Sequence, residues 1–213
     1  LPHIKSKKEL FKCIKYIYRI CKHALTIGCI FKNTNKIVKK DMRIGIGITG
    51  YLQSSKEQKE WLKDGYVMLR KYDIKYSKLH GFNKSIKLTT VKPSGTLSLL
   101  FNTTAGVSPG FSNYYIRRVR IDSSSPLIDI CKKAGYPIEP KRSIQKNGIY
   151  KIDKQTMIIS FPKKSKPGTI VANNLTAIQQ LNHVKDIQKN WSDNSVSVTI
   201  YYKKSEIKNI KIW

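Results

Sequence analysis

The chain has 213 residues, 40% of them apolar, which is enough to build a hydrophobic core and excludes a disordered polypeptide. Its 41 lysine and arginine residues against 13 acidic residues give a formal net charge of +28, typical of proteins that neutralise phosphate groups. No signal peptide opens the chain and no apolar run approaches the roughly 20 residues that cross a bilayer, which argues against a membrane protein and predicts a cytoplasmic location.

The N-terminal segment predicts one long helix followed by a glycine-rich stretch. Ser6-Lys7-Lys8-Glu9 has the pattern of a capping box, and apolar residues at helical spacing predict a helix from residue 6 to about 27. Residues 33–41 are polar and indicate a linker. Residues 43–50 read Arg-Ile-Gly-Ile-Gly-Ile-Thr-Gly, in which alternating glycines indicate a buried segment with closely packed backbones. The spacing also resembles a dinucleotide loop, but the lysine-rich segment before it does not predict the required strand.

A second capping-box pattern, Ser54-x-x-Glu57, predicts a helix to about Lys71. A turn around His80-Gly81 then returns the chain to a β-rich run, residues 89–92. The chain therefore alternates between helix and strand in this region.

A small-residue turn follows this run and leads into an apolar, helix-like segment, residues 97–101. The turn consists of Pro93, Ser94, Gly95 and Thr96. Backbone N–H groups at the start of a helix lack intrahelical partners and, with the helix dipole, favour an anion. Ser94 and Thr96 add hydroxyl donors, while Gly95 permits close approach of a phosphate. On spacing alone, an ordinary capped helix is the favoured interpretation of this turn.

The next segment predicts a loop, a cationic strand, a short helix and a hairpin. The expected elements are a loop at 103–113, a strand at 114–121, a helix from Ser125-Pro126 to Gly135, a polar hairpin at 139–153 and a strand at 156–161. In the short helix, Leu127, Ile130, Cys131 and Ala134 are expected to face inward.

The C-terminal segment predicts a lysine-rich loop at 162–168, a helix at about 174–191 and an alternating, β-branched strand at 195–202. Residues 206–213 begin one further element. Helices that alternate with strands predict an α/β protein with mainly parallel pairing, and we expect residues 1–213 to form a single domain.

The four cysteines fit neither a disulfide framework nor a zinc site, because Cys13, Cys21 and Cys29 are spaced eight residues apart and Cys131 is remote. They are expected to pack as small apolar residues in a reducing compartment, and no metal site is predicted.

Three separated stretches resemble one family. These are residues 88–100 (Leu-Thr-Thr-Val-Lys-Pro-Ser-Gly-Thr-Leu-Ser-Leu-Leu), 107–110 (Val-Ser-Pro-Gly) and 115–119 (Tyr-Ile-Arg-Arg-Val). Together they resemble the catalytic subunit of ribonucleotide reductases, most nearly the adenosylcobalamin-dependent, monomeric class II ribonucleoside-triphosphate reductases. The glycine-rich residues 43–50 and residues 191–202 match the same family in the same order.

The resemblance implies part of a ten-stranded α/β barrel, with this chain as its C-terminal portion. It implies that Pro93, Ser94, Gly95 and Thr96 bind the phosphates of a ribonucleoside triphosphate. It also implies adenosylcobalamin as cofactor and a thiol reductant such as thioredoxin. The family's radical cysteine and its assisting Asn and Glu are expected upstream of Leu1, and its terminal redox cysteines beyond Trp213, so no catalytic residue is assigned and the chain alone is expected to be inactive.

Two alternatives remain open from the sequence. One is a basic α/β protein that binds nucleic acid, although the lysines are spread from Lys5 to Lys211 without an arginine cluster. The other is a fragment of a class I or diphosphate-specific reductase. The Pro-Ser-Gly-Thr form of the turn argues against this alternative.

Overall fold

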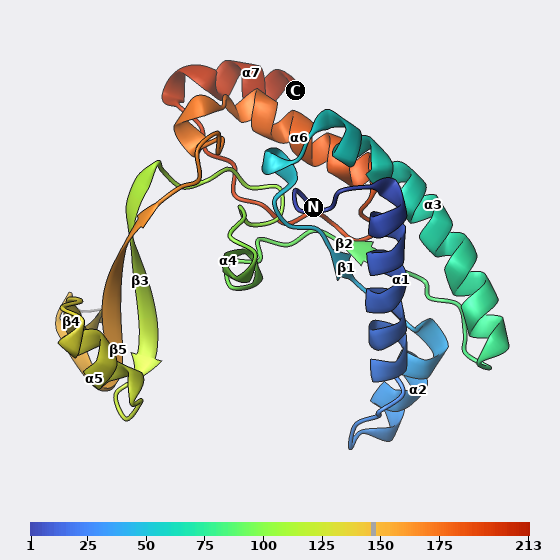
Figure 1. The fold of residues 1–213 in the computed structure, drawn as a ribbon, viewed down its shortest axis with the longest axis horizontal. Coiled ribbons are helices and arrows are strands. Elements are labelled where there is room, and N and C mark those ends of the chain that lie inside the picture. The colour runs from blue at the N-terminus through green and yellow to red at the C-terminus, as the bar shows by residue number, and fades with distance from the viewer. Residues whose placement is uncertain (146–147) are drawn as a thin grey trace. The chain divides into compact units, whose positions relative to one another are not determined.

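The computed structural model describes residues 1–145 and 148–213 and divides the chain into two compact units. The first unit contains residues 1–110 and 168–213, and the second contains residues 111–167. The prediction of a single domain stays a prediction. Each unit is described separately below (Figure 1).

The first unit is mainly helical. Its helices are α1 (Lys7–Ala24), α2 (Lys32–Asp41), η1 (Tyr51–Gln53), α3 (Lys56–Leu79), α4 (Leu97–Leu100), η2 (Ala172–Asn174), α6 (Ala177–Asn190), η3 (Lys204–Glu206) and α7 (Ile207–Ile212). Its strands are β1 (Ile46–Gly47) and β2 (Thr89–Thr90).

The predicted first helix is confirmed as α1, which starts where Ser6 Oγ accepts a hydrogen bond from the N–H of Glu9 (3.2 Å). The Glu9 carboxylate caps the N–H of Lys5 (2.7 Å) instead of the N–H of Ser6, so the capping box is only half formed. The prediction of a linker at residues 33–41 was wrong, because α2 occupies them. The helix predicted from Ser54 begins one residue later, at a complete capping box of Ser55 and Gln58, and continues to Leu79.

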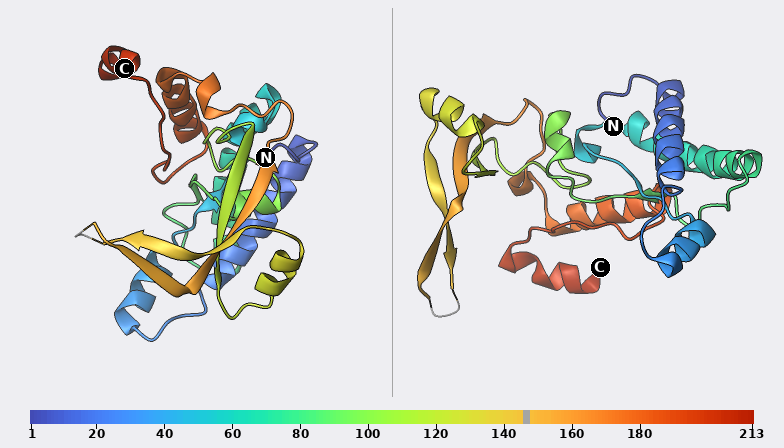
Figure 2. Two further views of the ribbon diagram at one scale, coloured as in Figure 1. Left: turned by 90° about the vertical axis from the view of Figure 1, so that its left-hand side faces the viewer. Right: turned by 90° about the horizontal axis from the view of Figure 1, so that it is seen from below.

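The helices α1 and α3 run side by side and enclose a polar contact (Figures 1 and 2). A glycine, Gly65, faces α1 at their closest approach, where an added Cβ would lie 3.2 Å from Ile14 Cδ1. Lys22 Nζ and Asp73 Oδ1 form a fully buried ion pair at 2.9 Å, and Tyr18 OH donates to the same carboxylate oxygen (2.8 Å). The two helices therefore form a packed wall, joined by the close contact at Gly65 and by the buried ion pair.

The small sheet lies at the centre of the first unit. Strand β1 pairs with β2 in parallel, with Ile46 opposite Thr89 and Gly47 opposite Thr90. Gly45 packs closely against this pair, since its added Cβ would lie 3.1 Å from Thr90 Cγ2, which confirms the close backbone packing predicted for residues 43–50. The core around the sheet consists of Leu10, Ile14, Tyr18, Ile44, Ile46, Ile48, Tyr51, Leu52, Leu62, Leu69, Leu88, Val91, Val107, Ile187 and Trp191.

The second unit is an antiparallel sheet with one short helix. Its elements are β3 (Tyr114–Asp122), α5 (Leu127–Lys133), β4 (Ile138–Ile144) and β5 (Tyr150–Lys164). The strand order is β3-β5-β4, and Figure 2 shows the strong twist of this ribbon. The predicted hairpin at 139–153 is confirmed in its two strands, and its residues 146 and 147 lie outside the described residues.

Three predictions need correction. The pairing is not mainly parallel, because the three-stranded sheet is antiparallel, and the parallel pairing in the described part of the chain consists of the two pairs of β1 and β2 and the isolated bridge between Gly110 and Val171. In α5, Leu127 and Ile130 are 53% and 61% exposed, because the helix is short and turns this side to solvent within its unit. Residues 195–202 keep an alternating exposure but form no strand in the described part of the chain. Backbone bonds such as Ser197 N–H to Val91 O (3.0 Å) join this segment to the chain after β2 without a ladder.

Candidate functional site

The turn at Pro93–Thr96 leaves the carboxyl end of β2, on the same edge where the chain leaves β1. Parallel strands end at the same edge of a sheet, so the segments that follow them come together there. Residues Pro93, Gly95 and Thr96 are exposed and Ser94 is half-buried. The structure thus presents all four predicted residues as one turn that solvent can reach.

The hydroxyl of Thr49 lies between this turn and the loop at residues 103–106. It accepts from Ser94 Oγ (3.3 Å) and from the N–H of Gly106 (3.3 Å), and it donates to the carbonyl of Thr104 (2.8 Å). One donated and two accepted bonds use the full capacity of a hydroxyl group. Ser94 therefore points its hydrogen toward Thr49 in this structure.

A glycine is required where the loop meets the chain just before the turn. Gly106 has φ +56°, and a Cβ on it would lie 2.5 Å from the carbonyl oxygen of Lys92. Any other residue would be strained by its backbone and would collide with that carbonyl. The contact sets the position of the backbone that enters the turn.

The helix after the turn, α4, lies within the predicted apolar segment 97–101. α4 has only four residues, and its N-cap residue, Thr96, makes no side-chain capping bond. A helix this short has too few aligned peptide groups for a significant dipole, so the dipole argument for an anion site does not hold. The groups that could still bind an anion at this turn are hydrogen-bond donors of the turn itself. Within the described residues, no hydrogen bond uses the backbone N–H groups of Thr96 and Leu97. An added Cβ on Gly95 would meet nothing within 4 Å.

Strand β2 is held by side chains from the segment after α6. Thr89 Oγ1 donates to the carbonyl of Trp191 (2.5 Å) and accepts from the N–H of Asp193 (3.0 Å). The carbonyl of Thr89 accepts from Asn194 Nδ2 (2.7 Å), and the N–H of Leu88 donates to Asp193 Oδ2 (2.9 Å). These bonds fix the strand from which the turn leaves.

Asp193 is the centre of this clamp. Burial by itself raises the pKa of the Asp193 carboxyl, but hydrogen bonds from Tyr66 OH, the N–H of Leu88 and the Arg70 guanidinium outweigh it and hold the pKa below its ordinary value. Arg70 Nη2 lies 2.8 Å from Asp193 Oδ2. The carboxylate is therefore charged, and both of its oxygens accept structural hydrogen bonds, Oδ1 from Tyr66 and Oδ2 from Arg70 and Leu88.

The cysteines show no catalytic arrangement. All four are free; Cys13, Cys21 and Cys131 are half-buried, whereas Cys29 is exposed, contrary to its expected packing role. Burial raises the pKa of the Cys21 thiol, which disfavours the reactive thiolate. Residues 1–145 and 148–213 contain no group of His, Cys, Asp or Glu that could hold a metal ion.

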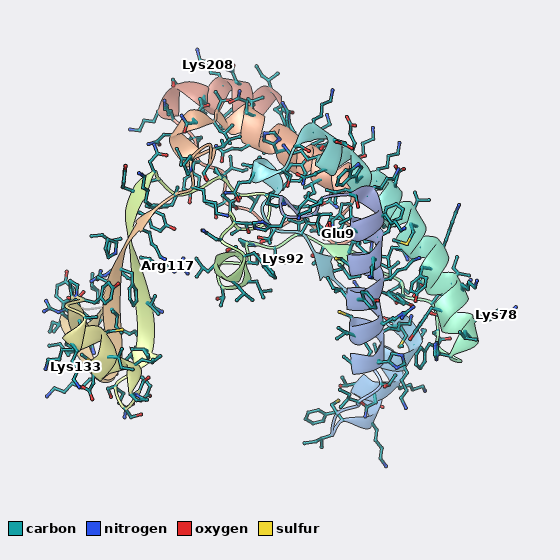
Figure 3. All side chains as sticks on the ribbon, viewed as in Figure 1. Glu9, Lys78, Lys92, Arg117, Lys133 and Lys208 are labelled. Atoms are coloured by element: carbon teal, nitrogen blue, oxygen red, sulfur yellow. The ribbon has the colours of Figure 1, made fainter. Side chains whose placement is uncertain are left out.

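Cationic side chains occur on both units, as the labelled lysines of α3, α5 and α7 illustrate (Figure 3). In the described part of the chain, no helix is both long enough and apolar enough to cross a membrane.

Comparison with known proteins places the chain in a family. The family model described as "Ribonucleotide reductase, barrel domain" matches residues 56–212. The chain therefore belongs to the ribonucleotide reductase family, and its fold is part of the α/β barrel domain of that family.

Individual relatives within this family are similar to the chain over most of its length. The chain is 35% identical over 203 residues to the probable adenosylcobalamin-dependent ribonucleoside-triphosphate reductase of Dictyostelium discoideum, covering 92% of this chain and 26% of the relative. It is 33% identical over 201 residues to the adenosylcobalamin-dependent ribonucleoside-triphosphate reductase of Euglena gracilis, with the same coverage. A crystal structure of a B12-dependent class II ribonucleotide reductase superposes with a TM-score of 0.76 at 26% identity, covering 95% of this chain and 32% of that one. The chain thus spans about a quarter of the length of these curated relatives.

Sequence reasoning found the exposed turn but missed the residues that hold it. Thr49 lies inside the glycine-rich residues 43–50, where the sequence pattern assigns a role to the glycines alone. Asp193 lies between the helix predicted at about 174–191 and the strand predicted at 195–202, outside every predicted element. The only signal for either was position: Thr49 follows β1 as Ser94 follows β2, and Asp193 follows a long helix.

Proposed function

We propose that this chain contributes the substrate-phosphate turn of an adenosylcobalamin-dependent ribonucleoside-triphosphate reductase, with Pro93, Ser94, Gly95 and Thr96 around the phosphates. The observation that carries the proposal is the exposed turn at the shared carboxyl edge of β1 and β2. Ligands of sheets with parallel strands bind at this edge. The names of the relatives supply the substrate class and the cofactor.

The chemistry of the turn suits a phosphate. The N–H groups of Thr96 and Leu97 are donors that a phosphate oxygen can accept from, and the Thr96 hydroxyl is exposed beside them. Lys92 adds a positive charge at the entrance of the turn, although its Nζ donates to the carbonyl of Ser195 (3.1 Å). In this proposal the chain binds and orients the substrate, and the radical chemistry uses residues outside it.

No residue of this chain is assigned to the cobalamin. The second unit has a shallow surface hollow of about 450 Å³, lined by Tyr114, Tyr115, Ile116, Pro162, Lys163 and Lys164, which we do not assign to the cofactor. When bound to the whole enzyme, the cofactor would supply the radical that starts the reaction.

The reductant and the compartment are part of the same proposal. We propose that the whole enzyme receives electrons from a thiol reductant such as thioredoxin, in the cytoplasm. The free state of all four cysteines agrees with a reducing compartment.

The proposal is tested by nucleotide binding to the 213-residue chain and to Gly95→Val. Because an added Cβ at Gly95 meets nothing within 4 Å and its φ is not positive, valine should leave the fold and its thermal midpoint unchanged. The branched side chain would instead occupy the space of the phosphates, and we expect ATP to bind at least about tenfold more weakly, a loss of roughly 1.4 kcal/mol or more.

The matched control is Ser195→Val, which adds an exposed branched side chain outside the turn. ATP, ADP, adenosine and a short DNA duplex are compared at two salt concentrations. Saturable ATP binding that fails with adenosine and is lost only in Gly95→Val supports the proposal, and preference for ADP would indicate a diphosphate-specific reductase. Steeply salt-dependent duplex binding, equal in all variants and without ATP binding, would contradict it.

A further inference from the structure

The segment after β1 and the turn after β2 are joined by one side-chain contact. Gly47 pairs with Thr90 in register, so the two chains leave the sheet together. Thr49 lies two residues beyond β1, and Ser94 lies four residues beyond β2. Their hydroxyl oxygens are 3.3 Å apart, and Ser94 is the donor.

Thr49 is itself held firmly. Its hydroxyl donates to the Thr104 carbonyl at 2.8 Å and accepts from the N–H of Gly106, so the direction of its remaining lone pair is fixed. The carbonyl of Thr104 also accepts from the N–H of Gly50 at 2.8 Å. Thr49 therefore offers Ser94 an acceptor whose position is determined by the loop at 103–106 and not by the turn.

The bond to Thr49 ties the turn to the segment after β1, whereas the bonds from Gly95 N–H to Pro93 O (2.9 Å) and from Ser98 N–H to Ser94 O (3.0 Å) stay within the turn and α4. Pro93, Gly95 and Thr96 are exposed, and the helix that follows has only four residues. Short exposed segments with few buried contacts open locally at low free energy. A segment that must be ordered by its ligand binds more weakly than one already in the binding conformation.

We infer that Thr49 is a positioning residue for the substrate-phosphate turn: through its bond to Ser94 it holds the backbone of residues 93–97 in the conformation that receives the phosphates. The inference deepens the proposed function and rests on it. It assigns Ser94 a role different from the one expected from the sequence, because Ser94 anchors the turn while backbone N–H groups meet the phosphate.

The structure offers a matched set of variants. Thr49→Val removes the hydroxyl while keeping the shape of the side chain, and Thr49→Ser keeps the hydroxyl. Thr104→Val is the control, because Thr104 is buried in the neighbouring loop and its hydroxyl has no hydrogen-bond partner within the described residues. Ser94→Ala, alone and combined with Thr49→Val, tests whether the two hydroxyls act through one bond.

The first readout is binding of inorganic tripolyphosphate and of ATP, measured by calorimetry well below each variant's thermal midpoint. We expect Thr49→Val and Ser94→Ala each to weaken binding roughly two- to tenfold, because this is the change in affinity that the loss of one hydrogen bond produces. Thr49→Ser and Thr104→Val should bind like the wild type. The double variant should bind no more weakly than Thr49→Val, because both changes remove the same contact.

The second readout needs no ligand. Amide hydrogen exchange at Ser98 and Leu99, whose N–H groups donate to Ser94 O (3.0 Å) and Thr96 O (3.1 Å), should be roughly two- to tenfold faster in Thr49→Val than in the wild type, and unchanged in Thr104→Val. Unchanged exchange in Thr49→Val, or additive losses of binding in the double variant, would overturn the inference. If the wild type fails to bind either ligand but Thr49→Val still speeds exchange, the positioning role stands and the proposed function fails.

Discussion

The two units hold their sheets in opposite ways. In the first unit, the ladder of β1 and β2 contains only two residue pairs, and buried side chains from other segments hold the strands. In the second unit, β3 and β5 pair over nine residues in unbroken register, while much of the sheet surface is exposed. One sheet is fixed by side chains and the other by its backbone.

The difference explains where a binding turn can be built. A long ladder holds its strands in register without help but uses its backbone groups in the sheet. A short parallel pair leaves the following segments free to form loops, provided that buried contacts fix the strands. The first unit therefore combines a rigid base with an exposed turn, and substitutions of its buried polar side chains should have the larger effects.

The largest effect is expected from Asp73→Ala. The substitution leaves the Lys22 ammonium buried without its counter-charge, bonded only to Asn83 O (2.7 Å) and Ser85 Oγ (2.9 Å). Loss of one partner from a buried ion pair costs about 3–5 kcal/mol, and we expect the free energy of unfolding in urea to fall by that amount.

The control for Asp73 is Asp64→Ala on the same helix. Asp64 pairs with Lys7, and their side chains are 55% and 47% exposed, so the loss should stay below about 1 kcal/mol. Similar losses in the two variants would show that the wall of α1 and α3 does not depend on its buried pair.

A smaller but still substantial effect is expected from Asp193→Asn. The amide keeps the size of the side chain but weakens the bonds from Arg70, Tyr66 and the N–H of Leu88. Charge-assisted bonds contribute about 1.5–3 kcal/mol, and we expect a loss of about 2–3 kcal/mol near pH 7.

The pH dependence of this loss has a definite sign. The folded-state pKa of Asp193 lies below its ordinary value of about 3.9, so its contribution is fully present above that value. It disappears as the pH falls through the lower folded-state pKa. Urea unfolding of wild type and Asp193→Asn should therefore converge as the pH falls below about 4. A difference that is constant with pH would contradict the role of the charged carboxylate.

The sequence predicts the first unit's elements better than their connections. The helix from Ser6 could be predicted because its cap and apolar stripe are local, and so could the turn at 93–96. The bond between Thr49 and Ser94 could not, since it joins residues 45 positions apart and depends on the register of β1 and β2. The strand expected at 195–202 failed for a related reason: alternation describes exposure, but a strand also needs a partner along its length.

The smallest effect is expected in the second unit, from Arg118→Ala in β3. The guanidinium forms an ion pair with Glu139 of β4, and the two side chains are 59% and 39% exposed, so solvent replaces the lost contact at a cost of about 0–1 kcal/mol.

Ser160→Pro is the backbone counterpart, because the N–H of Ser160 in β5 donates to Pro137 O (3.0 Å) and a proline in the central strand removes this hydrogen bond. We expect that change to cost about 3 kcal/mol or more in urea unfolding. If Arg118→Ala were as costly as Ser160→Pro, the second sheet would also be held by side chains, and the contrast between the two units would fail.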